Sequence, residues 1–221
     1  MDLFDVIGPI MIGPSSSHTA GAARIGKVAR MLLGEPIATA DIALHGSFAQ
    51  TGQGHGTDRA LVGGLLGMEV DDPGLRDAFE RAEATGAAIA FRTVVLRGAH
   101  PNTVQLQLTA RSGKTLSMTA ASVGGGEIRV RRLEGLDVDF SGRENTLIVH
   151  HADHPGLIAS VSGLLAAAGV NIATMQVFRK QLGGEAVMVL ELDNALDEAS
   201  MAALRALADV RGAVFLRGRN R

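Results

Sequence analysis

The C-terminal part of the chain constrains the fold most, because its apolar residues alternate between two spacings in a regular order. A spacing of two residues is typical of a half-buried strand, and a spacing of three to four residues is typical of an amphipathic helix. These spacings predict a strand, a helix, two strands, a helix and a strand, at Thr146–His150, Leu157–Ala168, Ile172–Arg179, Val187–Leu192, Asp197–Leu207 and Val210–Leu216. Gly183-Gly184 marks the turn between the two central strands, and Asp197 is a typical helix N-cap.

This order is the β-α-β-β-α-β pattern of a ferredoxin-like domain, for which about 75 residues suffice. The short polar stretch Ser141–Glu144 precedes it and predicts a domain boundary. We therefore expect two domains, residues 1–140 and residues 145–221, in a protein of the α+β class.

The first domain is predicted to have its helices early and its strands late. Ile25, Val28, Ala29 and Leu32 recur at helical spacing, and Gly34 suits the end of that helix. The next two predicted segments are a short strand at 42–44 and a helix through Leu61, Leu65 and Met68. A helix capped by Asp72-Pro73 and buried through Leu75, Phe79 and Ala82 follows. The last predicted segments are a hairpin of 104–108 and 116–120 around the turn 111–114, and a strand at 128–130. The late strands predict an antiparallel sheet.

Composition and charge exclude several classes of function. Apolar residues make up 46% of the chain, which is ordinary for a globular protein, and the net charge of -2 gives no reason to expect nucleic acid as a partner. No apolar run approaches the roughly 20 residues that span a bilayer, so we expect no membrane association. The first 23 residues contain no Lys or Arg, so no secretory leader is indicated and we expect a cytoplasmic protein.

The first motif that carries chemistry is Gly13-Pro14-Ser15-Ser16-Ser17-His18-Thr19, directly before a predicted helix. A helix N-terminus offers unpaired backbone N–H groups, and hydroxyl groups there make a cradle for a carboxylate or a phosphate. His18 adds a group that exchanges protons near neutral pH. The alternative interpretation is a helix cap with more hydroxyl groups than it needs.

The second motif is the glycine-rich segment from His45 to Asp58, which we expect to form a loop between a strand and a helix. It gathers polar side chains and glycines, and glycine allows a ligand close to the backbone. A tight turn with solvent-facing histidines is the alternative. The spacing of glycines is not the dinucleotide pattern, because position 57 is Thr. His18, His45 and His55 are also the residue type of a zinc site, but their spacing lacks a metal-binding pattern, so we expect no metal.

Three further segments have both a functional and a structural interpretation. His100–Thr103 and Ser122–Gly126 lie at strand ends, where they complete a pocket or form ordinary turns. Asp153-His154-Pro155-Gly156-Leu157 lies before a predicted helix, where backbone N–H groups suit an amino-acid carboxylate, and the alternative is a plain turn. Asn171 is either a turn residue or a ligand contact.

The two N-terminal motifs resemble the signatures of the β subunits of iron–sulfur-dependent L-serine dehydratases, and this resemblance extends over essentially the whole chain. The segment from Asp153 to Arg179 resembles ACT domains, which bind small effectors, often amino acids. The resemblance therefore implies an N-terminal serine dehydratase β-type domain and a C-terminal ACT domain.

The resemblance also implies an activity, an L-serine ammonia-lyase that converts L-serine to pyruvate and ammonia. In such enzymes a [4Fe-4S] cluster binds the substrate hydroxyl, and the cluster cysteines belong to an α subunit. This chain contains no cysteine, and clusters are held mainly by cysteine thiolates. The expected partner is therefore a cysteine-bearing α subunit that ligates the cluster, and this chain alone should be inactive. ACT domains often pair with one another, so a homodimer is also expected.

Elimination of water needs a base for the Cα proton and an anchor for the carboxylate. We expect His55 to be the base, with His45 and His18 as supporting or alternative proton carriers. The expected substrate-binding residues are Ser15, Ser16, Ser17, Thr19, Ser47, Thr51 and Asp58. The expected effector-binding residues of the ACT domain are Asp153, His154, Gly156, Leu157 and Asn171.

A rival hypothesis makes the chain a non-catalytic amino-acid sensor, because a related domain resembles the allosteric substrate-binding domain of some phosphoglycerate dehydrogenases. The segment with two histidines favours the enzyme, since a sensor needs no proton carriers.

Overall fold

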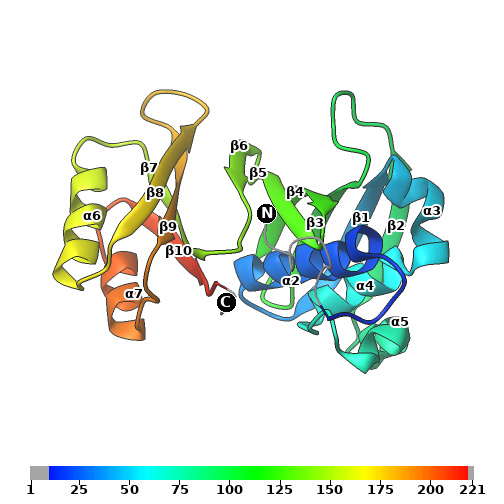
Figure 1. Ribbon diagram of the computed structural model, residues 1–221. Coiled ribbons are helices and arrows are strands. Elements are labelled where there is room, and N and C mark those ends of the chain that lie inside the picture. Colours follow the sequence, from blue (N-terminus) through cyan, green and yellow to red (C-terminus); the bar gives the residue numbers. More distant parts are fainter. Residues whose placement is uncertain (1–9, 219–221) are drawn as a thin grey trace. The chain divides into compact units, whose positions relative to one another are not determined.

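A computed structural model describes residues 10–218 of the chain (Figure 1). The chain divides between Gly135 and Leu136 into two compact units. No described helix is long and apolar enough to cross a membrane.

The first unit contributes β1 to β5 to a six-stranded sheet with the strand order β2-β1-β3-β4-β5-β6. The two units divide at the start of β6, the strand that ends this order. The strands are β1 (Ile37–His45), β2 (Ala88–Val94), β3 (Thr103–Ala110), β4 (Thr115–Gly124), β5 (Glu127–Leu133) and β6 (Leu136–Phe140). The helices are a π-helix (Ser16–Ala20), α2 (Gly21–Leu33), α3 (Ser47–His55), α4 (Thr57–Leu65), a 3₁₀ turn (Pro73–Asp77) and α5 (Ala78–Ala84).

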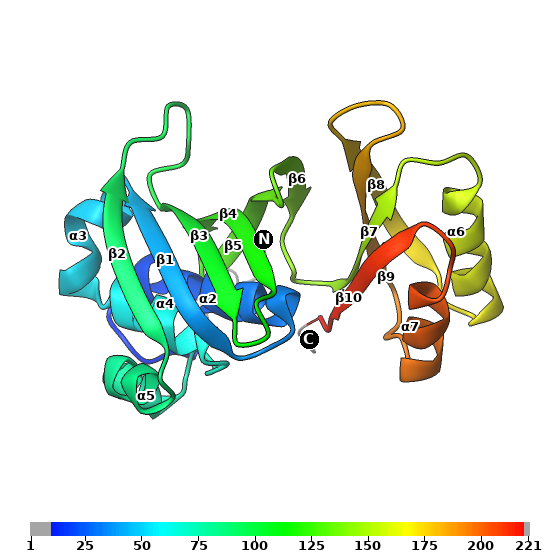
Figure 2. The ribbon, with the colours of Figure 1, turned by 180° about the vertical axis from the view of Figure 1, so that it is seen from behind.

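Helices α2 and α4 lie side by side on one face of this sheet (Figures 1 and 2). The predicted apolar stripe of α2 is confirmed, because Ile25, Val28, Ala29 and Leu32 are all buried. Gly34 ends the helix with a φ of 78°, a left-handed conformation that glycine adopts without strain. The cap at Asp72 is also confirmed, since its side chain accepts a hydrogen bond from the N–H of Gly74.

The strands confirm the predicted hairpin and correct the rest of the sheet. β3 pairs antiparallel with β4, and β4 with β5. The sheet is not wholly antiparallel as expected, because β1 pairs parallel with β2, a strand that the sequence did not predict. Helices α3, α4 and α5 form the long crossover connection that a parallel pair requires.

The glycine-rich segment from His45 to Asp58 is mostly helical, so the prediction of a loop is wrong. His45 is the last residue of β1, residues 47–55 form α3, and α4 begins at Thr57. Gly46 and Gly56 have positive φ angles of 58° and 67° and supply the two turns. The helix end at Met68 is also wrong, since α4 ends at Leu65. Closely spaced glycines hid α3, because glycine has a low intrinsic helix propensity, whereas the predicted helix through Leu61 and Leu65 is present as α4.

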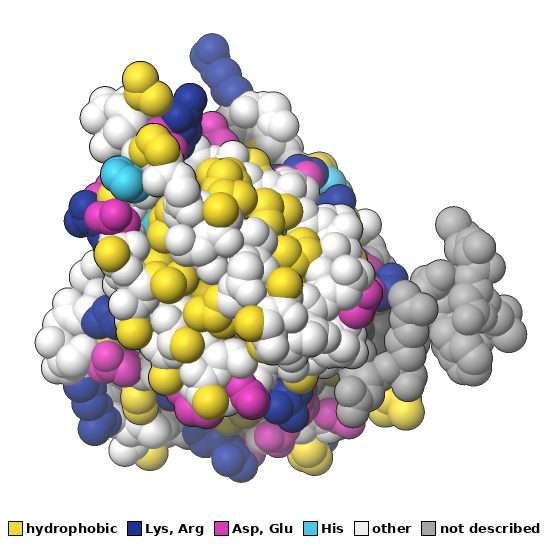
Figure 3. All heavy atoms as spheres, turned by 90° about the vertical axis from the view of Figure 1, so that its left-hand side faces the viewer, with side chains coloured by type: hydrophobic (Ala, Val, Ile, Leu, Met, Phe, Trp, Pro, Cys, Tyr) yellow, Lys and Arg dark blue, Asp and Glu magenta, His cyan; other side chains and the backbone are white. Residues whose placement is uncertain are grey.

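The second unit confirms the predicted β-α-β-β-α-β order. Its elements are β7 (Asn145–Ala152), α6 (Leu157–Ala167), β8 (Ile172–Arg179), β9 (Glu185–Leu192), α7 (Glu198–Arg205) and β10 (Val210–Leu216). The sheet order is β10-β7-β9-β8, and all of its neighbouring strands are antiparallel. The helices pack on the sheet through a core that includes Val149, Val161, Leu190 and Leu204. Hydrophobic side chains gather on the face of this unit that Figure 3 shows. Ile158 of α6 is 47% exposed.

Candidate active site

The first motif forms the π-helix at the start of α2. Ser15 caps it, because the Oγ of Ser15 accepts a hydrogen bond from the N–H of His18 over 3.2 Å. The Oγ atoms of Ser15 and Ser17 lie 3.3 Å apart. One hydroxyl therefore caps the helix as the sequence predicts, while the side chain of Ser16 forms no hydrogen bond within the described part of the chain. The carbonyl of Ser16 instead accepts from the N–H of Gly21.

The second motif begins where β1 ends and α3 starts. The N–H of Ser47 donates to the carbonyl of Pro101 over 2.8 Å, so the segment 100–103 borders the start of α3. A Cβ atom at Gly46 would lie 2.6 Å from that carbonyl, so the turn has room only for glycine. The N–H of Ser122 in turn donates to the carbonyl of Asn102. This packing sets the position of Ser47.

The two motifs meet at His18. Its Nε2 lies 3.0 Å from the Oγ of Ser47, and its Nδ1 lies 3.1 Å from the Oγ of Ser17. The ring centroids of His18 and His55 are 5.0 Å apart, and the buried ring of Phe48 packs edge-on against His18 at 5.4 Å. Both nitrogens of His18 therefore touch hydroxyl groups, which donate or accept as the tautomer requires.

Burial lowers the pKa of His18 below its usual 6.5, and the nearby charge of His55 lowers the pKa further. A buried imidazolium loses solvation, and a second positive charge close by makes it still less favourable. His18 is therefore held in the neutral form near pH 7, in which it can pass a proton between hydroxyl groups.

His55 is positioned by one hydrogen bond at its Nδ1, which lies 3.1 Å from the carbonyl oxygen of Thr51. A carbonyl only accepts, so Nδ1 carries the hydrogen, and the Nε2 of the neutral ring has a free lone pair. No described residue hydrogen bonds to this Nε2. The ring is half-buried at the C-terminal end of α3. A base with this geometry can take a proton from a ligand.

The other predicted residues occupy varied positions. Thr51 donates to the carbonyl of Ser47 over 2.9 Å, and its hydroxyl lies 3.5 Å from the Oγ of Ser47, so it borders the cluster. The Nδ1 of His45 contacts Val94 and Leu96 instead of the cluster. The carboxylate of Asp58 accepts from the N–H of Arg59 in the first turn of α4. Buried Thr19 donates its hydroxyl proton to the carbonyl of His55 over 3.0 Å, which ties the two motifs together.

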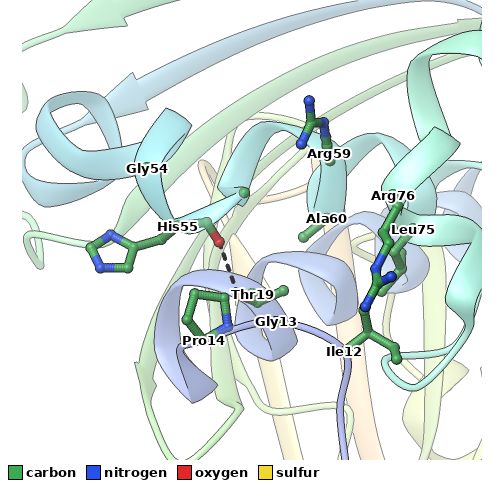
Figure 4. A pocket seen from close by; sticks show the side chains of 11 residues that line it. Ile12, Gly13, Pro14, Thr19, Gly54, His55, Arg59, Ala60, Leu75 and Arg76 are labelled. Carbon is green, nitrogen blue, oxygen red and sulfur yellow. Dashed lines mark hydrogen bonds between the residues drawn. The ribbon is translucent and has the colours of Figure 1, made fainter.

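A cavity of about 240 Å³ adjoins the two motifs (Figure 4). Gly13, Pro14, Thr19 and the segment 54–56 form part of its lining. Arg59 and Arg76 line it as well, and sequence reasoning missed both. Arg59 directly follows the second motif, which is a weak signal, whereas nothing around Arg76 in the sequence indicates a site.

Only some of the residues that we expected to bind an effector lie close to one another. Asp153 accepts from the Nη1 of Arg179 over 2.6 Å and from the N–H of Gly183 over 3.0 Å, and these bonds lower the pKa of its carboxyl. Gly156 stands before α6 with a φ of 93°, and exposed His154 lies 3.8 Å from Asp209. The side chain of Leu157 belongs to the core, and Asn171 donates to Asp193.

The described residues offer no donor set for a metal ion, and the chain offers no thiolate for an iron–sulfur cluster. The chain has no cysteine, and among residues 10–218 no group of three or more His, Asp or Glu side chains could hold a metal ion. Any cluster would therefore need ligands from another chain.

The fold and the site together define a class: an α+β unit with a histidine–hydroxyl cluster, followed by a small β-α-β-β-α-β unit. Comparison with known families gives the same division. The family model of the serine dehydratase beta chain matches residues 1–92, and that of the ACT domain matches residues 145–209.

Individual relatives cover nearly the whole chain. It is 44% identical over 196 residues to the probable L-serine dehydratase beta chain of Bacillus subtilis, covering 89% of each chain. It is 38% identical over 202 residues to the L-serine dehydratase beta chain of Peptoniphilus asaccharolyticus, covering 91% of each. The chain therefore belongs to the family of L-serine dehydratase β chains, with a C-terminal ACT domain, and a β chain implies a partner α chain.

A more distant similarity relates the chain to D-3-phosphoglycerate dehydrogenase of Bacillus subtilis. The two are 27% identical over 190 residues, which is 86% of this chain but 36% of that enzyme. The identities to the β chains are higher and cover 89% and 91% of those chains, so they support the lyase subunit over the sensor.

Proposed function

We propose that this chain supplies the proton-handling part of an L-serine dehydratase active site, which an α chain completes. The observation that carries the proposal is the meeting of the two motifs at His18, which contacts Ser47 on one side and the ring of His55 on the other. The names of the full-length relatives support L-serine as the substrate.

In the proposed reaction, the free Nε2 of His55 removes the Cα proton of L-serine, and this proton, passed on from the protonated ring, completes the water that leaves as the Cβ–O bond breaks. The resulting aminoacrylate becomes an imine, which water hydrolyses to pyruvate and ammonia. The hydroxyl groups of Ser15, Ser17, Ser47 and Thr51 bind the carboxylate or line the pocket, and His18 relays protons among them. We assign the acid that assists the departing hydroxyl, a [4Fe-4S] cluster, to the partner α chain, because this chain has no cysteine ligands.

Replacing His55 by Ala tests the proposal. Loss of a positioned general base costs roughly 10²- to 10⁴-fold in rate, so pyruvate formation from L-serine should fall by about that factor. The assay uses anoxic, co-expressed α and β chains, and each chain alone should show no turnover. Gln50→Ala, at an exposed position of the same helix, should retain turnover. A His55→Ala complex with intact cluster and near-normal turnover would remove His55 from the mechanism.

We also propose that the ACT unit binds a small amino acid at the start of α6. Gly156 leaves this helix without a side-chain cap, so its first N–H groups suit a carboxylate. Asp153 and His154 directly precede this turn, whereas the predicted effector residue Asn171 lies at the other end of the strands, where it donates to Asp193. Titration with L-serine should shift the amide resonances of residues 153–160, and unchanged resonances there would contradict the assignment.

A homodimer through the ACT units is a further proposal. Strand β8 ends the sheet order, and α6 carries exposed apolar side chains, of which Ile158 is the largest (Figure 3). A second copy would cover both features. Ile158→Lys should then lower the mass measured by light scattering, whereas Val95→Lys, at an exposed apolar position of the first unit, should not. Equal masses for wild type and Ile158→Lys would exclude this interface.

A further inference from the structure

The cavity beside the motifs has a chemistry that the proposed reaction does not use. In Figure 4, the imidazole of His55 extends away from Arg59 and Arg76, to the other side of Pro14. His55 is itself part of the cavity lining, but its imidazole points away from the two arginines. This arrangement gives the cavity two sides, one at His55 and one at the two arginines.

The charge of the cavity is positive. Arg59 extends from α4 and Arg76 from the 3₁₀ turn, and both side chains are exposed. Within the described part of the chain, no side chain forms an ion pair with either guanidinium, and no acidic residue is in the cavity lining. Two guanidinium groups without counter-charges attract an anion, and the planar fork of arginine matches a carboxylate.

The remaining lining is mainly apolar, with Ile12, Pro14, Ala60 and Leu75. The volume of about 240 Å³ suits a molecule of a few heavy atoms. An α-amino acid would bring an ammonium group that finds no carboxylate here. A small carboxylate with a short uncharged body satisfies the arginines and the apolar wall together.

We infer that this cavity is a second ligand site beside the histidine cluster, and that its arginine side binds a small 2-oxo acid anion such as pyruvate. Pyruvate is the ligand that the reaction itself would supply, and this part of the inference rests on the proposed function. The occupancy of this site would thus increase as the product, pyruvate, accumulates.

A direct connection leads from the cavity to the catalytic motif. Thr19 lines the cavity, and its hydroxyl donates to the carbonyl of His55. Gly13 packs so closely on Thr19 that a Cβ atom at Gly13 would lie 2.6 Å from the Cγ2 of Thr19. A ligand that displaces Thr19 therefore also displaces the backbone that carries His55. Bound 2-oxo acid should lower turnover without competing with serine.

Binding is tested on the full-length chain, without any need for turnover. Pyruvate is titrated while the methyl resonances of Ile12, Ala60 and Leu75 are followed by NMR, and L-serine and inorganic phosphate are titrated in parallel. We expect pyruvate to shift these methyl groups, with L-serine leaving them unchanged and phosphate binding more weakly. Loss of one charge-assisted contact should weaken pyruvate binding about ten-fold in Arg59→Gln and in Arg76→Gln. Arg97→Gln, at an exposed arginine outside the lining, should bind like wild type.

Two results would overturn the inference. One is an absence of pyruvate-dependent shifts at these methyl groups in the folded wild-type chain. The other is an unchanged affinity in both arginine variants, with amide spectra that show them to be folded. Equal shifts with phosphate would overturn the assignment to a 2-oxo acid. Each result is independent of the His55→Ala assay, so the failure of either proposal can be recognised separately.

Discussion

His18 is held at both ring nitrogens, whereas the described residues hold His55 at Nδ1 alone. This difference separates their chemical roles. A ring between two hydroxyl groups passes protons along a chain of hydrogen bonds, and a ring with one free nitrogen takes a proton from a ligand. The two rings also influence each other, because both cannot easily carry a positive charge at a centroid distance of 5.0 Å.

The coupling gives a prediction at the scale of one residue. His55→Gln removes the neighbouring charge, so the pKa of His18 should rise, yet remain below 6.5 because burial, the larger cause, persists. Ring resonances of His18 followed by NMR as a function of pH measure this value. Gln50→Ala serves as the control and should leave the titration unchanged. An identical His18 titration in His55→Gln would show that the two rings are not coupled.

Residue types were easier to predict than their contacts. The motifs marked His18, Ser47 and His55 because so many proton carriers and hydroxyl groups rarely gather in a short stretch. Nothing in the sequence showed that His45 contacts Val94 and Leu96, since this depends on the unpredicted strand β2. The arginines of the cavity were missed for a similar reason, because only the packing of the 3₁₀ turn brings Arg76 to the motif.

At the scale of elements, α2 and α4 approach closely because glycines face the contact. A Cβ atom at Gly26 would lie 2.3 Å from the carbonyl of Leu61, and one at Gly64 would lie 2.0 Å from the carbonyl of Ala23. Both obstacles are backbone atoms, so no side chain can move aside to make room. The spacing of this helix pair also positions the π-helix and the start of α4, which carry parts of both motifs.

Gly64→Ala should therefore destabilise the first unit. Overpacking of this kind costs roughly 1–3 kcal/mol in the free energy of unfolding, which chemical denaturation followed by circular dichroism measures. Gly54→Ala is the matched control, because a Cβ atom at this helical position meets nothing within 4 Å. It should be neutral or slightly stabilising. Equal stability of the two variants would show that the helices can move apart without cost.

At the same scale, Asp153 connects the end of β7 to the turn between β8 and β9 through hydrogen bonds. The N–H of Gly183 and then Arg179 lower the pKa of Asp153 below 3.8. The carboxylate therefore stabilises the fold above pH 3.8, and this contribution is lost as the pH falls through the lowered pKa. Asp153→Asn should lower the free energy of unfolding at pH 7 and approach wild type in strong acid. A difference that stays constant with pH would contradict this explanation.

At the scale of the whole molecule, the two units have separate cores. The core of the second unit is formed by its own strands and helices, with residues such as Leu147, Leu165 and Met188. Residues 136–221 expressed alone should therefore fold, giving dispersed amide resonances and one cooperative unfolding transition. A spectrum typical of an unfolded chain would show that this unit depends on residues 1–135.

The second unit was also the part of the fold that the sequence predicted best. Its strands and helices are short and strictly periodic, and capping residues such as Asp197 mark their ends. The first unit was harder, since the parallel pair of β1 and β2 joins residues more than 40 positions apart. Sequence patterns show the spacing of apolar residues that are close along the chain. Neither the pairing of distant strands nor a helix rich in glycine produces such a spacing.

The π-helix at the first motif makes the site sensitive to chain length. The N–H of Gly21 reaches back five residues to the carbonyl of Ser16, one more than in an α-helix, so this turn contains one additional residue. Each residue of a regular helix turns the chain by about 100°. Deleting a single residue between Ser16 and Ala20 would restore the ordinary turn and rotate the preceding hydroxyl groups away from α3. Insertions and deletions here would thus abolish the site even when every functional side chain is retained.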